Sequence, residues 1–316
     1  MNLDQLRSFV TVAQLGHFTR AAEQLHLAQP SLSRQIASLE SDLGAELFRR
    51  ARGGSTLTSA GESLLPLARR MLSDAEAVRR ELAELAGLQR GRVRLGATPT
   101  LCISLVAEVL GVFHDAHPDI ELHVSEKGSL RLLDELAAGE LDLAVVTTTD
   151  PTAADRFEVT PLLVEEVVLI STAASPPVTN RGTIGLRDVA ALPQILFSST
   201  YDLRSATDAA FRALSLTPNV VLEGAEMDAV LRFVERGLGV AIVPAMVLVD
   251  RPGLRAVRLE GPELNRTISL ARPAIGTPAI ATRVMEQTIS ATAKDFAARA
   301  GETLRLVAPR ASSTQR

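Results

Sequence analysis

The chain has 316 residues, of which 46% are hydrophobic and 22% charged, and this composition predicts a globular protein of two or three domains. Its single cysteine, Cys102, excludes an intramolecular disulfide, and because we find neither a signal-like N-terminus nor a membrane-length apolar run, we expect a cytoplasmic protein without a membrane partner. The net charge of −4 divides into 13 arginines against 10 acidic residues at positions 1–94 and 20 basic against 27 acidic residues at positions 95–316, so a basic N-terminal part precedes an acidic body.

Residues 3–15 predict an amphipathic helix that ends at Gly16. Residues 19–44 predict two further helices joined by a tight turn, because each has an apolar stripe at helical spacing. The stripes are Ala22, Leu25 and Leu27, then Leu32, Ile36, Leu39 and Leu43. We expect Thr19 to cap the first of these helices, Pro30 to lie in the first turn of the second, and Gly44 to end it in a left-handed conformation.

The polar face of the second helix carries short hydrogen-bond donors and one guanidinium, which are side chains that meet phosphates and base edges in a DNA major groove. The candidates are Gln29, Pro30, Ser31, Ser33, Arg34, Gln35 and Ser38. Of these, Gln29 and Arg34 are best placed for bidentate contacts with bases. A helical hairpin with a solvated polar face is the alternative.

Residues 46–58 predict two short strands around a turn at Gly53-Gly54, with arginines at the tip. Such a hairpin beside a helix-turn-helix is a wing that can reach the DNA backbone or minor groove, and a solvated loop is the alternative. We expect Thr19, Arg50 and Arg52 to anchor phosphates.

A long helix is predicted from Ser59 to about Gly87, with apolar residues at alternating steps of four and three. This heptad seam is Leu64, Ala68, Met71, Ala75, Val78, Leu82 and Leu85. A lone helix of this length is marginal in water, so the seam must pack against another surface. A second copy of the chain would supply that surface without any other protein. The resulting dimer would read two near-palindromic half-sites. Packing on the chain's own second domain is the alternative.

From residue 91 onward, short apolar strands alternate with helices, which predicts an α/β domain with a parallel sheet and right-handed crossovers. The expected strands are 93–97, 120–124, 141–146, 166–170, 194–197, 220–223, 240–243 and 267–270. One expected helix ends near residue 116, and the other expected helices span 129–138, 203–214, 228–236 and 279–300. Two cycles of this pattern predict two lobes around a cleft, with the strands near 159–163 and 266–271 as the hinge between them.

Three hydroxyl-rich segments follow predicted strands, and they are Thr98-Pro99-Thr100, Thr147-Thr148-Thr149 and Ser198-Ser199-Thr200. Ligands of open α/β sheets bind beyond the carboxyl ends of strands, so we expect these segments to form a pocket for a small organic acid or similar polar metabolite. Ser129 and Glu226, each at the start of a predicted helix, are candidate rim residues. Ordinary helix capping by Ser or Thr is the alternative for any single segment.

No catalytic, cofactor or metal site is predicted, because the sequence contains no glycine-rich phosphate loop, no metal-spaced cysteines and no nucleophile elbow. Two weaker alternatives concern single side chains. His114 and His117 could share a metal ion, and Cys102 near a helix N-terminus could have a lowered thiol pKa and sense oxidants. The chain has no second cysteine to resolve an oxidised thiol.

The first 60 residues resemble the LysR-type transcriptional regulators, with the opening LDQLRSFVTVAQLGHFTRAAEQL and the recognition segment QPSLSRQI. The family's following motif residues are Leu39-Glu40, Leu43-Gly44, Leu47-Phe48, Arg50, Leu57-Thr58 and Gly61. The family's second wing arginine corresponds to Gly53 here, so Arg52 would make its contact from a shifted position. Further along, GELDLAVV at 139–146 and VERGLGVAIVP at 234–244 resemble the family's effector domain.

The resemblance implies an α/β protein with a winged helix-turn-helix (1–58), a dimerising linker helix (59–90), an effector domain of periplasmic-binding-protein type II architecture (91–302) and a flexible tail (303–316). Lobe I would comprise about 91–160 and 268–302, and lobe II about 161–267. Family members are usually tetramers built from dimers, in which the effector alters DNA bending, and we also expect a contact with RNA polymerase. The function predicted is that of a sequence-specific, ligand-responsive regulator. A solute-binding module or an enzyme on the same two-lobed fold is the alternative.

Overall fold

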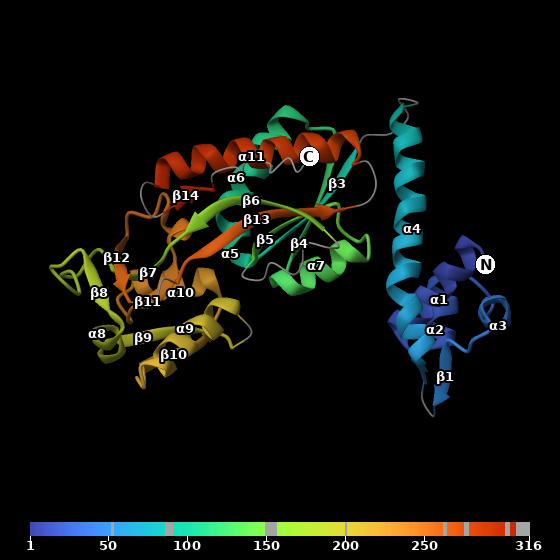
Figure 1. Ribbon diagram of the computed structural model, residues 1–316, viewed down its shortest axis with the longest axis horizontal. Coiled ribbons are helices and arrows are strands. Elements are labelled where there is room, and N and C mark those ends of the chain that lie inside the picture. Colours follow the sequence, from blue (N-terminus) through green and yellow to red (C-terminus); the bar gives the residue numbers. More distant parts are fainter. Residues whose placement is uncertain are drawn as a thin grey trace, which may run out of the picture. The chain divides into compact units, whose positions relative to one another are not determined.

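The computed structural model describes residues 1–51, 54–85, 91–148, 157–199, 201–261, 264–274, 278–300 and 304–307. The chain forms two compact units, Met1–Gly91 with Asp134–Asp142 and Arg92–Leu133 with Leu143–Arg316 (Figure 1). The expected combination of an N-terminal helix-turn-helix and a C-terminal α/β domain is confirmed.

The N-terminal unit is a small helical domain with a two-stranded wing. Its elements are α1 (Leu3–Leu15), α2 (Phe18–Gln24), α3 (Gln29–Leu43), β1 (Phe48–Ala51), β2 (Gly54–Leu57) and α4 (Ser59–Leu85). The capping glycines are confirmed, because Gly16 and Gly44 end α1 and α3 with φ of 67° and 68°. Pro30 lies in the first turn of α3 as predicted.

Two expectations about these helices are wrong. Thr19 is not the N-cap, because α2 begins at Phe18 with His17 in the cap position. The Phe18 ring packs edge-on against the Phe48 ring, with 5.6 Å between the ring centroids, so the first residue of α2 is held against the wing. Leu43 is 41% exposed, since the core beyond Leu39 is completed by Leu47, which is 1% exposed.

Two of the motif residues connect α3, the wing and α4. The Glu40 carboxylate on α3 accepts hydrogen bonds from the backbone amides of Leu47 (2.8 Å) and Phe48 (3.3 Å). At Gly61, in the first turn of α4, a Cβ atom would lie 2.3 Å from the carbonyl oxygen of Leu47, so only glycine fits. These contacts set the orientation of the wing relative to α3.

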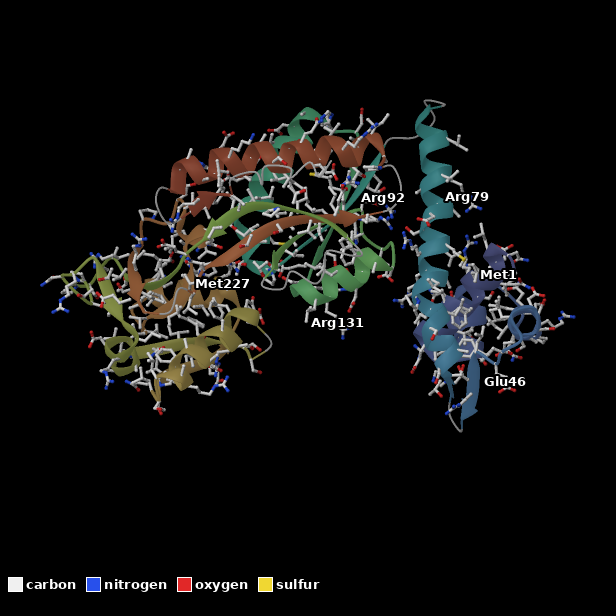
Figure 2. The ribbon with its side chains drawn as sticks, viewed as in Figure 1. Met1, Glu46, Arg79, Arg92, Arg131 and Met227 are labelled. Carbon is white, nitrogen blue, oxygen red and sulfur yellow. The ribbon has the colours of Figure 1, made fainter. Side chains whose placement is uncertain are left out.

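The predicted seam of α4 divides between two surfaces. Leu64 and Ala68 pack into the core of the N-terminal unit, so that part of the seam is satisfied within the chain. A second apolar stripe on α4 is exposed, and it consists of Leu67 (54%), Met71 (38%), Val78 (56%) and Leu82 (61%). Figure 2 shows α4 continuing past the other N-terminal helices, with the side chains around Arg79 projecting from it. We call these four residues the α4 stripe.

Lobe I of the C-terminal unit is built on a six-stranded mixed sheet of order β14-β6-β13-β5-β3-β4. Its strands are β3 (Arg92–Ala97), β4 (Glu121–Glu126), β5 (Leu143–Thr148), β6 (Phe157–Glu165), β13 (Arg266–Pro273) and β14 (Leu304–Leu306). Its helices are α5 (Pro99–Leu101), the π-helical η1 (Cys102–Val106), α6 (Ala107–Ala116), α7 (Ser129–Ala137) and α11 (Ile280–Ala300). Helices α6 and α11 lie side by side over the sheet (Figure 1).

In the sheet of lobe I, the prediction of parallel pairing holds for β3 with β4 and β5, whereas β13 pairs antiparallel with β5 and β6, and β14 pairs antiparallel with β6. The prediction of a tail from residue 303 is wrong for residues 304–306. This strand pairs with β6, and its Leu304 is 2% exposed. Strands β6 and β13 cross between the lobes side by side, as expected for a hinge pair.

Lobe II contains the four-stranded sheet β11-β7-β12-β8 and the parallel pair β9–β10, joined by a bridge between Gln194 and Val240. Its strands are β7 (Val167–Thr172), β8 (Thr183–Gly185), β9 (Pro193–Phe197), β10 (Asn219–Ala225), β11 (Ala241–Pro244) and β12 (Leu254–Glu260). Its helices are α8 (Leu186–Ala191), α9 (Asp202–Ala213), α10 (Met227–Glu235) and the 3₁₀ turn η3 (Ala245–Leu248). At Gly239 a Cβ atom would lie 2.5 Å from the Pro193 carbonyl oxygen, which accounts for the second glycine of VERGLGVAIVP.

One segment, Pro99–Ala116, is long and apolar enough to cross a membrane by length and composition alone, although Glu108 and Asp115 interrupt its apolar run. Four of its large apolar side chains, Leu101, Leu105, Val109 and Phe113, are buried in the core of lobe I, while Val112 is 56% exposed. The apolar composition of this segment is explained by its place as a core helix under α11.

Candidate functional site

The predicted functional residues lie mainly on two surfaces. The first surface is the exposed face of α3. Near its N-terminus the Gln29 amide donates to Ser33 Oγ at 3.1 Å, and the Arg34 guanidinium donates to Ser31 Oγ at 3.3 Å. Arg34 is exposed, while Leu32 and Ile36 on the other side of the helix are buried. A guanidinium and an amide are therefore presented together on a helix held by its apolar side.

Gln35 and Ser38 also make contacts within the N-terminal unit that the sequence did not predict. The Ser8 hydroxyl on α1 donates to the Gln35 side-chain oxygen, and the Gln5 amide donates to Ser38 Oγ at 3.0 Å. Both side chains accept these hydrogen bonds and so hold α3 against α1, while the Gln35 amide group and the Ser38 hydroxyl proton are not used in these contacts. The sequence pattern missed this because the partners on α1 are about 30 positions away.

The other DNA-binding candidates lie on α2 and the wing. Thr19 is exposed on α2, and Arg49 is exposed on β1. Arg50 lies on β1 opposite Ser55, but its side chain and the whole of Arg52 lie outside the described residues. The carbonyl oxygen of Gly16 accepts a hydrogen bond from the Ser55 amide at 2.7 Å, which fastens the wing to the end of α1.

The second surface is a cleft of about 380 Å³ within the C-terminal unit. Residues of both lobes and of the crossing strand β13 line it, and they are Thr98, Pro99, Thr100, Glu126, Lys127, Gly128, Thr147, Tyr201, Leu203, Glu226 and Arg266. Five predicted residues are therefore brought together: Thr98, Pro99, Thr100, Thr147 and Glu226. The cleft has the size of a small-molecule site.

The remaining predicted cleft residues are not among its lining residues. Ser129 Oγ accepts a hydrogen bond from the Thr147 amide at 3.2 Å and lies 3.1 Å from the Thr147 hydroxyl, so it supports a lining residue from behind. Ser199 is exposed. The side chain of Thr148 and the residues Thr149 and Thr200 lie outside the described part of the chain.

Six lining residues were missed from the sequence. Glu126, Lys127 and Gly128 follow strand β4 directly, so the same rule that selected the threonines after β3 and β5 would have found them. Tyr201 is the only tyrosine of the chain and stacks on Phe197 at 5.1 Å. Arg266 begins β13, and no local pattern points to its position.

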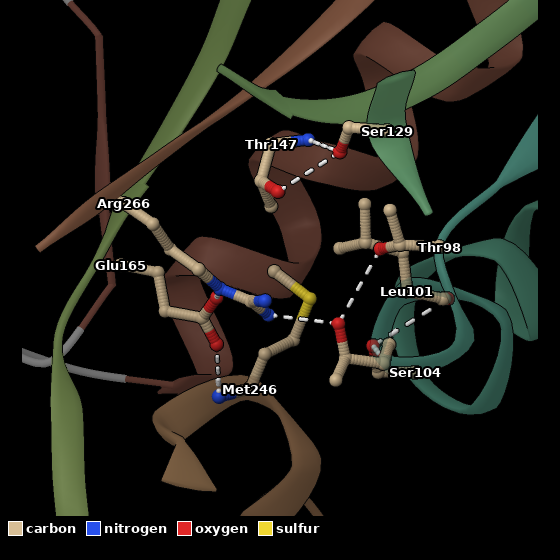
Figure 3. A network of polar contacts seen from close by, with 9 residues as sticks. Thr98, Leu101, Ser104, Ser129, Thr147, Glu165, Met246 and Arg266 are labelled. Atoms are coloured by element: carbon tan, nitrogen blue, oxygen red, sulfur yellow. Dashed lines mark hydrogen bonds and ion pairs between the residues drawn. The ribbon is translucent and has the colours of Figure 1, made fainter. Parts of the chain in front are cut away.

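Arg266, which lines the cleft, forms a buried ion pair with Glu165 (Figure 3). Arg266 Nε donates to Glu165 Oε2 at 2.6 Å, and the other Glu165 oxygen accepts from the Met246 amide at 2.6 Å. The Arg266 guanidinium also donates to Thr100 Oγ1 at 3.1 Å. Glu165 is completely buried, and these contacts join the crossing strands to η3 of lobe II and to α5 of lobe I.

Two carboxylates at the cleft act on neighbouring side chains. Burial raises the pKa of the Tyr201 hydroxyl, and a hydrogen bond to Glu226 and the negative charges of Glu226 and Glu126 raise it further. Tyr201 and Glu226 belong to lobe II, whereas Glu126 belongs to lobe I. The negative charges of both carboxylates therefore raise the pKa of the same group, the Tyr201 hydroxyl.

Cys102 is not an activated thiol. Burial raises the pKa of its thiol from 9.0 to about 12, and the charge of Glu126 and a hydrogen bond with it act in the same direction. The alternative of a lowered thiol pKa is therefore contradicted. The desolvated site and the neighbouring carboxylate outweigh any effect of the helix N-terminus.

We expect iodoacetamide to label Cys102 slowly, because a pKa of about 12 lowers the thiolate fraction at pH 8 about a thousandfold relative to an ordinary thiol. Labelling should accelerate up to the highest pH at which the fold survives. Glu126→Gln should speed the reaction, and unfolded protein should react at the ordinary rate. Rapid labelling of the folded protein at pH 8, measured by mass spectrometry, would contradict this assignment.

The two histidines considered for a metal site lie at the end of α6. The His117 ring packs against Phe113 at 5.1 Å. Among the described residues, no group of three or more His, Cys, Asp or Glu side chains is arranged to hold a metal ion.

Comparison with known families matches both units of the chain. Residues 3–62 match the bacterial regulatory helix-turn-helix protein, lysR family, and residues 86–292 match the LysR substrate binding domain. The HTH-type transcriptional regulator YybE of Bacillus subtilis is 32% identical over 271 residues, which are 86% of this chain and 92% of that protein. A probable nitrogen assimilation transcriptional activator of Synechococcus elongatus is 32% identical over 276 residues, 86% of this chain and 89% of that protein.

Solved structures show the same fold. A full-length OxyR variant from Pseudomonas aeruginosa is 26% identical with a TM-score of 0.66, covering 93% of this chain and 95% of that chain. CbnR complexed with its target DNA is 23% identical with a TM-score of 0.62, covering 94% of this chain and 100% of that chain. With its helix-turn-helix and its substrate-binding domain both matched, the chain belongs to the LysR family of DNA-binding transcriptional regulators.

Proposed function

We propose that this regulator binds a near-palindromic promoter site as a dimer, and that a small polar ligand in the cleft changes the arrangement of its subunits on DNA. The observation that supports DNA binding is the N-terminal end of α3. Its polar side carries Gln29, Ser31, Ser33 and Arg34, and its apolar side is buried and fixes the helix in place. The wing arginines and Thr19 are proposed to contact phosphates.

Two half-sites require two copies of the chain, and the α4 stripe offers an apolar surface for the second copy. The helices of two copies would place two α3 helices on successive half-sites. Association of such dimers into tetramers, contact with RNA polymerase and a cytoplasmic location are further parts of the proposal. The chain is proposed to act without catalysis and without a cofactor other than its effector.

The cleft is the proposed effector site, because it is enclosed by both lobes and by a strand that connects them. A ligand can shift the regulator between two states only by binding one of them more tightly. A site lined by both lobes meets this requirement, since closing the lobes changes every contact to the ligand.

We expect Arg34→Ala to weaken binding to the specific operator by about 1–3 kcal/mol and to relax the preference for one base pair in each half-site. Binding to unrelated DNA should change little. The operator can be located by testing DNA that flanks the coding region, and affinities can be measured by fluorescence anisotropy at fixed salt.

Arg7→Ala is the matched control, because Arg7 is an exposed arginine on α1 that is paired with Asp4. It should leave operator affinity near that of the parent protein. If Arg34→Ala were no weaker than Arg7→Ala on the specific site, Arg34 would not be a base-reading residue.

A further inference from the structure

The charges around the cleft restrict its ligand more closely than its hydroxyl groups do. Four charged side chains line it: Glu126, Lys127, Glu226 and Arg266. The Arg266 guanidinium is already neutralised by the buried Glu165 at 2.6 Å, so it offers a positive charge only in part. A purely anionic ligand would meet the two carboxylates as well as the Lys127 ammonium, so the charges of the lining do not favour an anion over a ligand that also carries a cationic group.

The carboxylates belong to opposite walls of the cleft. Glu126 ends β4 of lobe I, and Glu226 precedes α10 of lobe II. Both side chains are exposed, so both carboxylates can be reached by a ligand that enters the cleft. Their charges converge at the Tyr201 hydroxyl, which hydrogen-bonds to Glu226. A cationic group between the two walls would remove their mutual repulsion and add two charge-assisted hydrogen bonds.

Hydrogen-bond donors line the cleft beside Glu126, because Thr98 directly follows Ala97, the residue that pairs with Glu126 in the sheet. Thr98 and Thr100 are buried and lie 3.4 Å apart through their hydroxyl oxygens. Thr100 Oγ1 also accepts from Arg266 at 3.1 Å, and since the contact between the two hydroxyls uses one of their two protons, the other proton can be donated to a ligand. Thr98, Thr147 and Arg266, which are drawn in Figure 3, all line the cleft, and their hydroxyl and guanidinium groups can donate to the oxygens of a carboxylate.

We infer that the cleft takes a small zwitterion, an α-amino acid or a close relative, with its ammonium group between Glu126 and Glu226 and its carboxylate on the threonine hydroxyls beside Arg266. The cleft volume of about 380 Å³ suits a molecule of this size. This inference rests on the proposed function of the cleft as the effector site, and it replaces the broader expectation of a small organic acid.

The test uses the full chain and isothermal titration calorimetry with the twenty L-α-amino acids. For each amino acid that binds, the matched carboxylic acid without the amino group and the matched amine without the carboxylate are titrated as well. We expect at least one amino acid to bind, and each matched compound to bind about 10- to 100-fold more weakly, the loss that follows from removing one charged hydrogen bond. Glu226→Gln and Glu126→Gln should each lower the binding affinity for the amino acid by a similar factor.

Glu121→Gln is the matched control, because Glu121 is an exposed acid at the other end of β4 and is absent from the cleft lining. It should bind the amino acid as the parent protein does. The inference is overturned if no amino acid binds, if the carboxylic acid without its amino group binds equally well, or if Glu226→Gln binds the amino acid unchanged. Binding of the unliganded parent protein to its operator is measured in parallel, so that failure of the regulator function is recognised separately.

Discussion

Replacing Glu165 with alanine should lower the free energy of unfolding of the C-terminal domain by about 3–5 kcal/mol. The Glu165 carboxylate is completely buried, and its two oxygens accept from Arg266 Nε and the Met246 amide, each at 2.6 Å. Alanine would leave a guanidinium that is only 14% exposed without its counter-ion and a backbone amide without an acceptor. The loss can be measured by urea denaturation followed by circular dichroism.

Glu158 provides a control on the same strand, β6. It pairs with Arg272 but is 58% exposed, so Glu158→Ala should cost at most about 1 kcal/mol. Glu165→Gln should fall between the two alanine variants, because it keeps an acceptor but loses the charge. The double variant Glu165→Ala/Arg266→Ala should be less destabilised than the sum of the single variants. Equal stability of Glu165→Ala and Glu158→Ala would show that the buried pair contributes little.

The double substitution Val78→Glu/Leu82→Glu should dissociate the proposed dimer and weaken operator binding about 100- to 10,000-fold. Val78 and Leu82 are 56% and 61% exposed in the single chain, and in a paired helix each would bring a carboxylate into an apolar seam. Loss of the second half-site removes the high effective concentration of the second α3 helix. Sedimentation velocity would report the assembly state, and fluorescence anisotropy would report the affinity for DNA.

Ala77→Glu is the control for the added charge, because Ala77 is an exposed position of the same helix outside the α4 stripe. It should remain dimeric and bind the operator normally. A double variant that kept both the assembly state and the operator affinity would place the dimer contact elsewhere.

Local patterns in the sequence were sufficient for most of the helices and strands that position the two sites. The stripe at Leu32, Ile36 and Leu39 predicted the buried side of α3, and Gly44 predicted its end. Side-chain period and capping preference act over a few residues, so they can be read without knowing what the element packs against. The hydroxyl segments at Thr98–Thr100 and Thr147 were found for the same reason, since they directly follow apolar strands.

Other features depended on partners that are distant in sequence. Leu64 and Ala68 pack in the core of the N-terminal unit, whereas Leu67 belongs to the exposed α4 stripe, and only tertiary packing distinguishes them. Gln35 and Ser38 likewise hydrogen-bond to residues of α1. Glu165 and Arg266 are 101 positions apart, and only the pairing of β6 with β13 brings them together.

The sequence was therefore enough to establish the family, the order of most elements and the buried side of α3, because these follow from short-range periodicity and dense motifs. The tertiary structure alone decided which surface of α4 stays free and which charges surround the cleft. Those outcomes depend on which side chains from remote strands and helices converge, and no local preference specifies that convergence.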